Sequence, residues 1–188
     1  MKEKAMKLTH LLAAASLCIS AVAANATTIT QTAPQTSDGQ QFSFVFNGLS
    51  TSFTGGGTLT FAARGDYSPT FSSAANTLET LAGSAEGINF GNMGFDDADT
   101  RTAFRFDDNL WSRSFALSNA QLTTLLADGV LIVDAFLTSG VNLFNPATAY
   151  AGVSFDYTPG AAAVPEPATL GLFGLALAGF GAARRRRQ

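Results

Sequence analysis

Gln41–Asn47 reads Gln-Phe-Ser-Phe-Val-Phe-Asn, and this stretch decides the fold. Phenylalanine stands at every second position, so the rings share one face of an extended strand. Clusters of Gly, Asn, Asp and Ser separate this run from others with the same period of two. Those runs are residues 58–62, 103–106, 112–117 and 152–157. Short alternating strands between turn residues predict an all-β fold, a single antiparallel β-sandwich over residues 27–159.

Three further segments complete the expected sandwich. The polar residues 28–32 predict an edge strand, and Gly129–Val133 predicts a strand that is buried on both faces. A short helix is expected within residues 118–127, because Ser118 is a good N-cap and the following leucines have helical spacing. It should end at Asp128-Gly129 and cap one end of the sandwich.

Phenylalanine dominates the expected core. The chain has 16 phenylalanines, and all but Phe173 and Phe180 lie in residues 27–163. At alternating strand positions these rings are expected to point inward and fill the space between the sheets. The glycines at 55–57 are expected to form a turn that leads into the strand at 58–62.

The charge and composition of residues 27–163 exclude several functions. This part holds four arginines against 12 acidic residues, a net charge of −8, and contains no Lys, His or Cys. Such a negative charge argues against nucleic-acid binding. Without Cys and His, this part can form neither a disulfide scaffold nor a typical zinc site. The missing side chains also exclude Ser-His-Asp, Cys-His and Ser-Lys catalysis. We therefore expect that this protein is not an enzyme.

Carboxylate chemistry is the remaining, less favoured, catalytic possibility. A glycoside hydrolase needs two carboxyl groups that flank the sugar. Glu79 and Glu86 are seven residues apart and would meet only across a turn, for which Gly83-Ser84 is available. The alternative is that Glu79 is an exposed strand residue beside Thr77 and Thr80.

Residues 1–26 have the layout of a secretory signal peptide. Three lysines come first, the apolar run 11–24 follows, and Ala24 and Ala26 occupy the small-residue positions that a signal peptidase reads. The apolar run is shorter than the roughly 20 residues that span a membrane. The Sec translocon and signal peptidase are therefore expected partners, and Thr27 the first mature residue.

The other end of the chain predicts a membrane anchor. After the short linker 160–163, residues 164–188 begin with Val164, Pro165, Glu166 and Pro167, continue with the uncharged stretch 168–183, and close on an arginine cluster. The cluster consists of Arg184, Arg185, Arg186 and Arg187. A transmembrane helix over 168–183 is expected, and positive residues beside a span stay cytoplasmic. The sandwich would then lie outside the inner membrane.

The order Pro-Glu-Pro, apolar helix, arginine cluster resembles the PEP-CTERM sorting signal. The resemblance implies a Gram-negative bacterium that makes an exopolysaccharide. It also implies an exosortase, a membrane transpeptidase that recognises Pro165, Glu166 and Pro167 and removes the tail. Residues 57–66 look like strands of other exosortase-sorted ectodomains, which are similar to jelly-roll or lectin-like sandwiches. The alternative for the tail is a plain single-span anchor.

Two acidic clusters are candidates for a structural Ca²⁺ site, since Ca²⁺ prefers oxygen ligands. Asp96, Asp97 and Asp99 crowd one loop together with Asn92, and Asp107, Asp108 and Asn109 form the other. The spacing is not that of an EF-hand. The alternative is a solvated acidic loop in which Arg101 or Arg105 pairs with some of the carboxylates. No other cofactor is expected.

Sugar binding is a further possibility, because sandwich lectins stack sugars on exposed aromatic rings. Trp111 follows an acidic loop and is the best candidate, with Tyr67, Tyr150 and Tyr157 as further rings. The alternative is that Trp111 begins a strand and packs inward. We therefore expect an exported, non-catalytic surface or matrix protein associated with exopolysaccharide in a biofilm. The alternative is a carbohydrate-binding or Ca²⁺-dependent lectin-like module.

Overall fold

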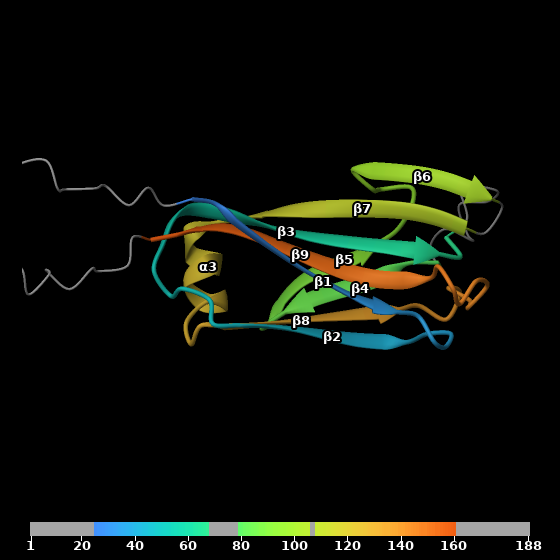
Figure 1. The fold of residues 1–188 in the computed structure, drawn as a ribbon, viewed down its shortest axis with the longest axis horizontal. Helices are drawn as coiled ribbons and strands as arrows, with labels where there is room; N and C mark the ends of the chain where they lie inside the picture. The colour runs from blue at the N-terminus through green and yellow to red at the C-terminus, as the bar shows by residue number, and fades with distance from the viewer. Residues whose placement is uncertain (1–24, 68–78, 106–107, 161–188) are drawn as a thin grey trace, which may run out of the picture. The chain divides into compact units, whose positions relative to one another are not determined.

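Two antiparallel sheets build the domain, and the all-β prediction is confirmed (Figure 1). The computed structural model describes residues 25–67, 79–105 and 108–160. One sheet contains, in order, β1 (Thr27–Pro34), β9 (Tyr150–Pro159), β3 (Phe53–Gly65), β7 (Asp108–Leu117) and β6 (Thr100–Arg105). The other contains β2 (Gln41–Asn47), β8 (Val130–Leu137), β4 (Leu81–Ala85) and β5 (Ile88–Met93).

The two expected targeting segments fall almost wholly outside the described residues. Of the signal peptide predicted over residues 1–26, only Asn25 and Ala26 are described, and both are exposed directly before β1. The transmembrane helix predicted over 168–183 lies entirely outside the described ranges.

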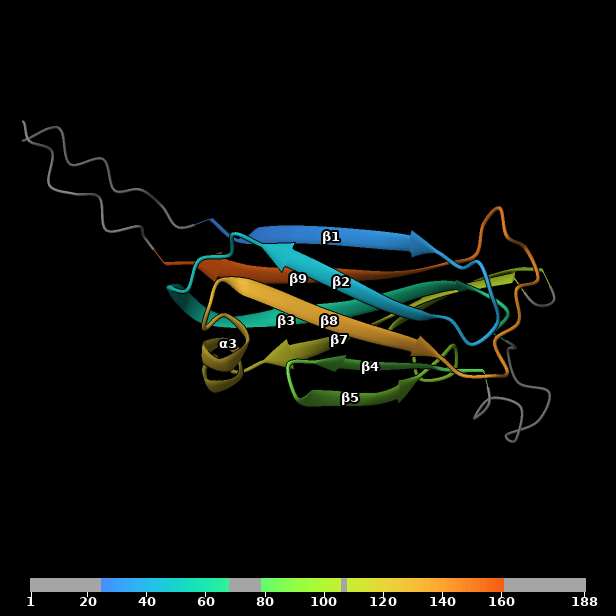
Figure 2. The same ribbon diagram turned by 90° about the horizontal axis from the view of Figure 1, so that it is seen from below.

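The core lies between the two sheets, which Figures 1 and 2 show as two layers. Along β2 every second residue is buried, so Phe42, Phe44 and Phe46 point inward as their spacing predicts. The opposite sheet contributes inward residues from β3 and β9, among them Phe61 and Phe155, both without exposed surface. Full burial of one such side chain contributes about 1.5–3 kcal/mol, so this interior accounts for most of the favourable free energy of folding.

Glycines allow close approach between chain segments at two places in the core. A Cβ on Gly83 in β4 would lie 2.6 Å from Phe61 Cζ, so the ring packs directly on the β4 backbone. A Cβ on Gly56 would lie 2.6 Å from the Leu117 carbonyl oxygen, and one on Gly57 2.8 Å from that of Asp156. The expected turn at 55–57 is therefore wrong. These glycines belong to β3, where the chain passes between β7 and β9.

The predicted helix is confirmed as α3 (Asn119–Leu125), which lies at one end of the sandwich (Figure 1). Ser118 is its N-cap and forms a capping box with Gln121, whose side-chain oxygen accepts a 2.9 Å hydrogen bond from the Ser118 backbone N–H. Leu122 and Leu125 are the buried residues of this helix. The helix thereby closes the hydrophobic core at this end.

Two expectations about the strands are corrected, and one hairpin is new. β8 is buried on one face only, because Ile132 and Phe136 are 41% and 37% exposed on the other. β6 is exposed along its whole length, and Phe104 is 49% exposed and not a core residue. The hairpin of β4 and β5 was not predicted, and it turns at Glu86 and Gly87, both with positive φ.

The two ends of the domain are neighbours. β1 is an edge strand, as predicted, and it pairs with β9 so that Thr27 lies opposite Tyr157. β9 itself lies between β1 and β3. The part of the chain described by the structure has no helix long and apolar enough to cross a membrane.

Candidate functional site

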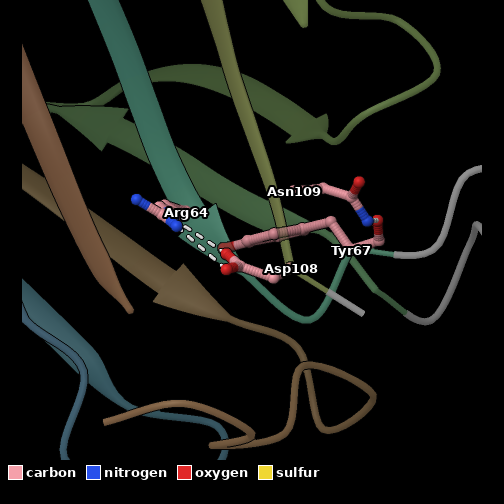
Figure 3. A network of polar contacts seen from close by, with 4 residues as sticks. All are labelled: Arg64, Tyr67, Asp108 and Asn109. Carbon is pink, nitrogen blue, oxygen red and sulfur yellow. Dashed lines mark hydrogen bonds and ion pairs between the residues drawn. The ribbon is translucent and has the colours of Figure 1, made fainter. Parts of the chain in front are cut away.

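An ion pair joins the end of β3 to the start of β7 (Figure 3). Arg64 donates from Nε and Nη2 to the two carboxylate oxygens of Asp108, at 2.8 and 2.9 Å. Asp108 is 5% exposed, and the hydrogen bonds from Arg64 hold the pKa of its carboxyl below the usual range. The same contact raises the pKa of Arg64, whose Cζ lies 4.1 Å from the Phe104 ring centroid. The pair is a bidentate structural contact between two strands.

Trp111 lies in the core and has no exposed surface. Its ring meets Tyr67 edge-to-face, with 5.4 Å between the centroids, and Asn109 donates from its side-chain nitrogen to the Tyr67 carbonyl oxygen. Burial, with a smaller contribution from the charge of Asp66, raises the pKa of Tyr67, so its phenol stays neutral. The inward alternative for Trp111 is therefore the observed one, and its ring offers no surface on which a sugar could stack.

The acidic loop before β6 is tied to β7 through its carboxylates. Asp97 pairs with Arg113 and accepts a 2.7 Å hydrogen bond from the Gly94 N–H. Asp99 accepts a 2.6 Å hydrogen bond from the Ser114 N–H. Asp96 is exposed in the same loop. Arg113 and Arg64 thus form ion pairs with two of the candidate carboxylates, which the sequence did not suggest. Arg105, one of the two arginines that it did suggest, lies opposite Asp108 in the pairing of β6 with β7, and its positive charge also lowers the pKa of Asp108.

The candidate calcium ligands do not gather into one cluster within the described ranges. There, no group of three or more His, Cys, Asp or Glu side chains could hold a metal ion. Asp108 is engaged by Arg64, while Asp97 and Asp99 hold the other loop. Asp107 lies outside the described residues.

The two candidate catalytic glutamates flank β4 at opposite ends. Gly83 and Ser84 lie inside this strand and form no turn, so they cannot bring Glu79 and Glu86 together. The strand alone spans roughly 17 Å, well beyond the carboxyl separation of a glycoside hydrolase. Glu86 instead accepts a 3.2 Å hydrogen bond from the Ile132 N–H. Glu86 therefore makes a structural contact with the backbone of β8.

A groove of about 280 Å³ runs along β4 on the outer face of the four-stranded sheet. Its floor consists of Ala82, Gly83 and Ser84, which are small. Phe136 of β8 forms one wall, and Ile88 and Asn89 of β5 belong to the other. This groove could not be predicted from the sequence, because β8 was expected to be buried on both faces and β4 and β5 were not predicted.

The predicted sorting residues lie outside the described part of the chain. These are Ala24, the motif Pro165, Glu166 and Pro167, the apolar stretch 168–183 and the cluster Arg184 to Arg187. Ala26 is the one predicted processing residue that the structure describes, and it is exposed.

Comparison with known proteins identifies the C-terminal segment. The PEP-CTERM protein-sorting motif matches residues 163–187. No curated protein matches the chain. Among solved structures, dimeric latent PorU from Porphyromonas gingivalis aligns with 74% of this chain and 14% of its own, at 12% identity and a TM-score of 0.37. The chain therefore spans about a seventh of that protein's length.

Proposed function

We propose that this PEP-CTERM protein is an exported, non-catalytic component of the cell surface or extracellular matrix, associated with exopolysaccharide. The observation that carries the proposal is the sorting motif at residues 163–187, which indicates export to the cell surface and recognition by an exosortase. After passage through the Sec translocon and removal of residues 1–26, residues 168–183 hold the chain in the inner membrane. Arg184 to Arg187 remain cytoplasmic, and cleavage by the exosortase releases the domain.

The chemistry of the domain supports a role in binding. Glu79 and Glu86 lie at opposite ends of β4, which disfavours a paired-carboxylate hydrolase. The regular two-sheet scaffold instead presents an open groove to solvent. Carbohydrate binding is therefore the second candidate function, and this groove is the observation that favours it. The Ca²⁺-dependent form of a lectin-like module is less favoured, because its candidate ligands bind arginines and backbone groups.

The sorting step is tested by immunoblotting of cell fractions from an exopolysaccharide-producing host. The full chain is compared with the double variant Pro165→Ala and Pro167→Ala, and is also expressed in a strain without the exosortase. We expect a larger, unprocessed form in the inner membrane in both cases. Pro159→Ala, which changes a proline at the end of β9, is the matched control and should be processed normally. Unchanged size and location in the exosortase mutant would contradict the proposal.

A further inference from the structure

On the outer face of the five-stranded sheet, polar side chains form hydrogen bonds with one another across neighbouring strands. Cross-strand hydroxyls bond to one another between Thr30 and Ser154 at 2.8 Å, and between Thr60 and Ser114 at 3.0 Å. A hydroxyl likewise meets a carboxylate where Thr28 donates to Asp156 at 2.9 Å. These side chains are already hydrogen-bonded within the sheet, which leaves them fewer groups to offer a ligand.

The outer face of the four-stranded sheet also carries Ser and Asp side chains, but these are not hydrogen-bonded to one another. Ser43 pairs in register with Asp134, and Asp134 pairs with Ser84 on its other side, so the three form one row across β2, β8 and β4. Within the described residues none of these side chains makes a hydrogen bond or an ion pair. Two hydroxyls and a carboxylate thus remain available to a ligand at the centre of this face.

An exposed aromatic ring lies beside this row. Phe136 is two residues from Asp134 along β8, on the same face and roughly 6.6 Å away along the strand. Its cross-strand neighbour is Ala82, whose small side chain leaves the flank of the ring open to the groove. Asn89 lies across the groove, and its side-chain oxygen accepts a 2.7 Å hydrogen bond from the Gly91 N–H, which leaves its amide nitrogen to point elsewhere. The groove therefore combines the apolar wall of Phe136 with Ser84 on its floor and Asn89 on its far side, and Asp134 lies next to it on β8.

We infer that this groove binds a segment of a neutral hexose polymer. A pyranose ring has an apolar C–H face that suits Phe136 and a rim of hydroxyls that can reach Ser84, Asp134 and Asn89. The groove lies on an open sheet face, so a chain can continue beyond it in both directions. A net charge of −8 in residues 27–163 disfavours an acidic polymer. The inference rests on the proposed matrix function and names the surface and ligand class that would serve it.

The test is affinity electrophoresis of the exported protein, expressed as the full chain, in gels that contain laminarin or dextran as neutral polymers. Alginate, an acidic polymer, is run in parallel. We expect retardation by a neutral polymer and none by alginate. Phe136→Ala and Asp134→Ala should each weaken binding about tenfold. Ala82→Trp should abolish it by filling the groove, and EDTA should have no effect.

The matched control is Phe144→Ala, which removes a more exposed phenylalanine away from the groove and should bind normally. Circular dichroism and thermal melts verify the fold of every variant. Binding to neither neutral polymer overturns the inference, as does binding that Phe136→Ala and Ala82→Trp leave unchanged. Retention of Phe136→Ala in the cell matrix at the wild-type level would contradict this site while leaving the sorting and matrix function intact.

Discussion

Asp108 shows how one buried carboxylate depends on its partner. Arg64 lowers the pKa of Asp108 in the folded state, so the pair stabilises the fold fully above the unfolded pKa of about 4. That contribution is lost as the pH falls through the lower, folded-state pKa. We expect the free energy of unfolding of the wild type, measured with urea, to decrease over this acidic range.

Asp108→Asn serves as the comparison, because it cannot titrate at this position. At neutral pH it should be less stable than the wild type by about 2 kcal/mol, and the difference should shrink as the pH is lowered. An equal pH dependence of both proteins would show that the pair does not contribute in this way. Asp156→Asn, at a half-buried carboxylate that bonds a threonine hydroxyl and no arginine, controls for the general loss of negative charge.

The sequence contains little information about these pairings. Arg64 and Asp108 are 44 positions apart, and they meet because β3 and β7 pair in one particular register. Arg101 and Arg105 are closer in sequence to the acidic loops, which made them the natural expectation. The orientation of the Trp111 side chain could not be predicted either, because a residue near the start of a strand can face either way until the register is known.

At the scale of elements, α3 closes one end of the core, and its first turn depends on Ser118. Ser118→Ala removes the cap that Gln121 shares, and should lower the free energy of unfolding by about 1 kcal/mol. Urea unfolding followed by circular dichroism measures the change. Ser118→Asp retains a capping acceptor and should recover most of the stability. If Ser118→Asp is as unstable as Ser118→Ala, the cap is not the cause.

Strands could be predicted where their side chains alternate clearly. The bounds of β2 match the predicted run, because three large rings mark one face. β4 was missed since its residues, Leu81–Ala85, are mostly small and include no β-branched side chain. The small residues serve the packing, because Gly83 receives the Phe61 ring from the opposite sheet. Packing between segments that are distant in the sequence produces no local sequence pattern from which such a strand could be predicted.

At the scale of the whole molecule, the dependence of stability on calcium can be measured directly. A specific ion that binds only the folded state raises its stability with concentration, by about 2.7 kcal/mol at 100 times the Kd. We expect Ca²⁺ and EDTA to give the same melting temperature, because Asp97, Asp99 and Asp108 already have partners. Magnesium at equal ionic strength controls for screening of the net negative charge. A rise specific to Ca²⁺ would contradict the expectation and favour the lectin-like alternative.

The position of β9 has a consequence for the timing of export. A chain that crosses the membrane from its N-terminus delivers β1 first and β9 last. Because β9 lies between β1 and β3, the five-stranded sheet stays divided until the final strand has emerged. A tail that pauses in the membrane would give this strand time to insert before release. Under the proposed sorting route, the signal would then act also as a delay, so that only finished domains are released.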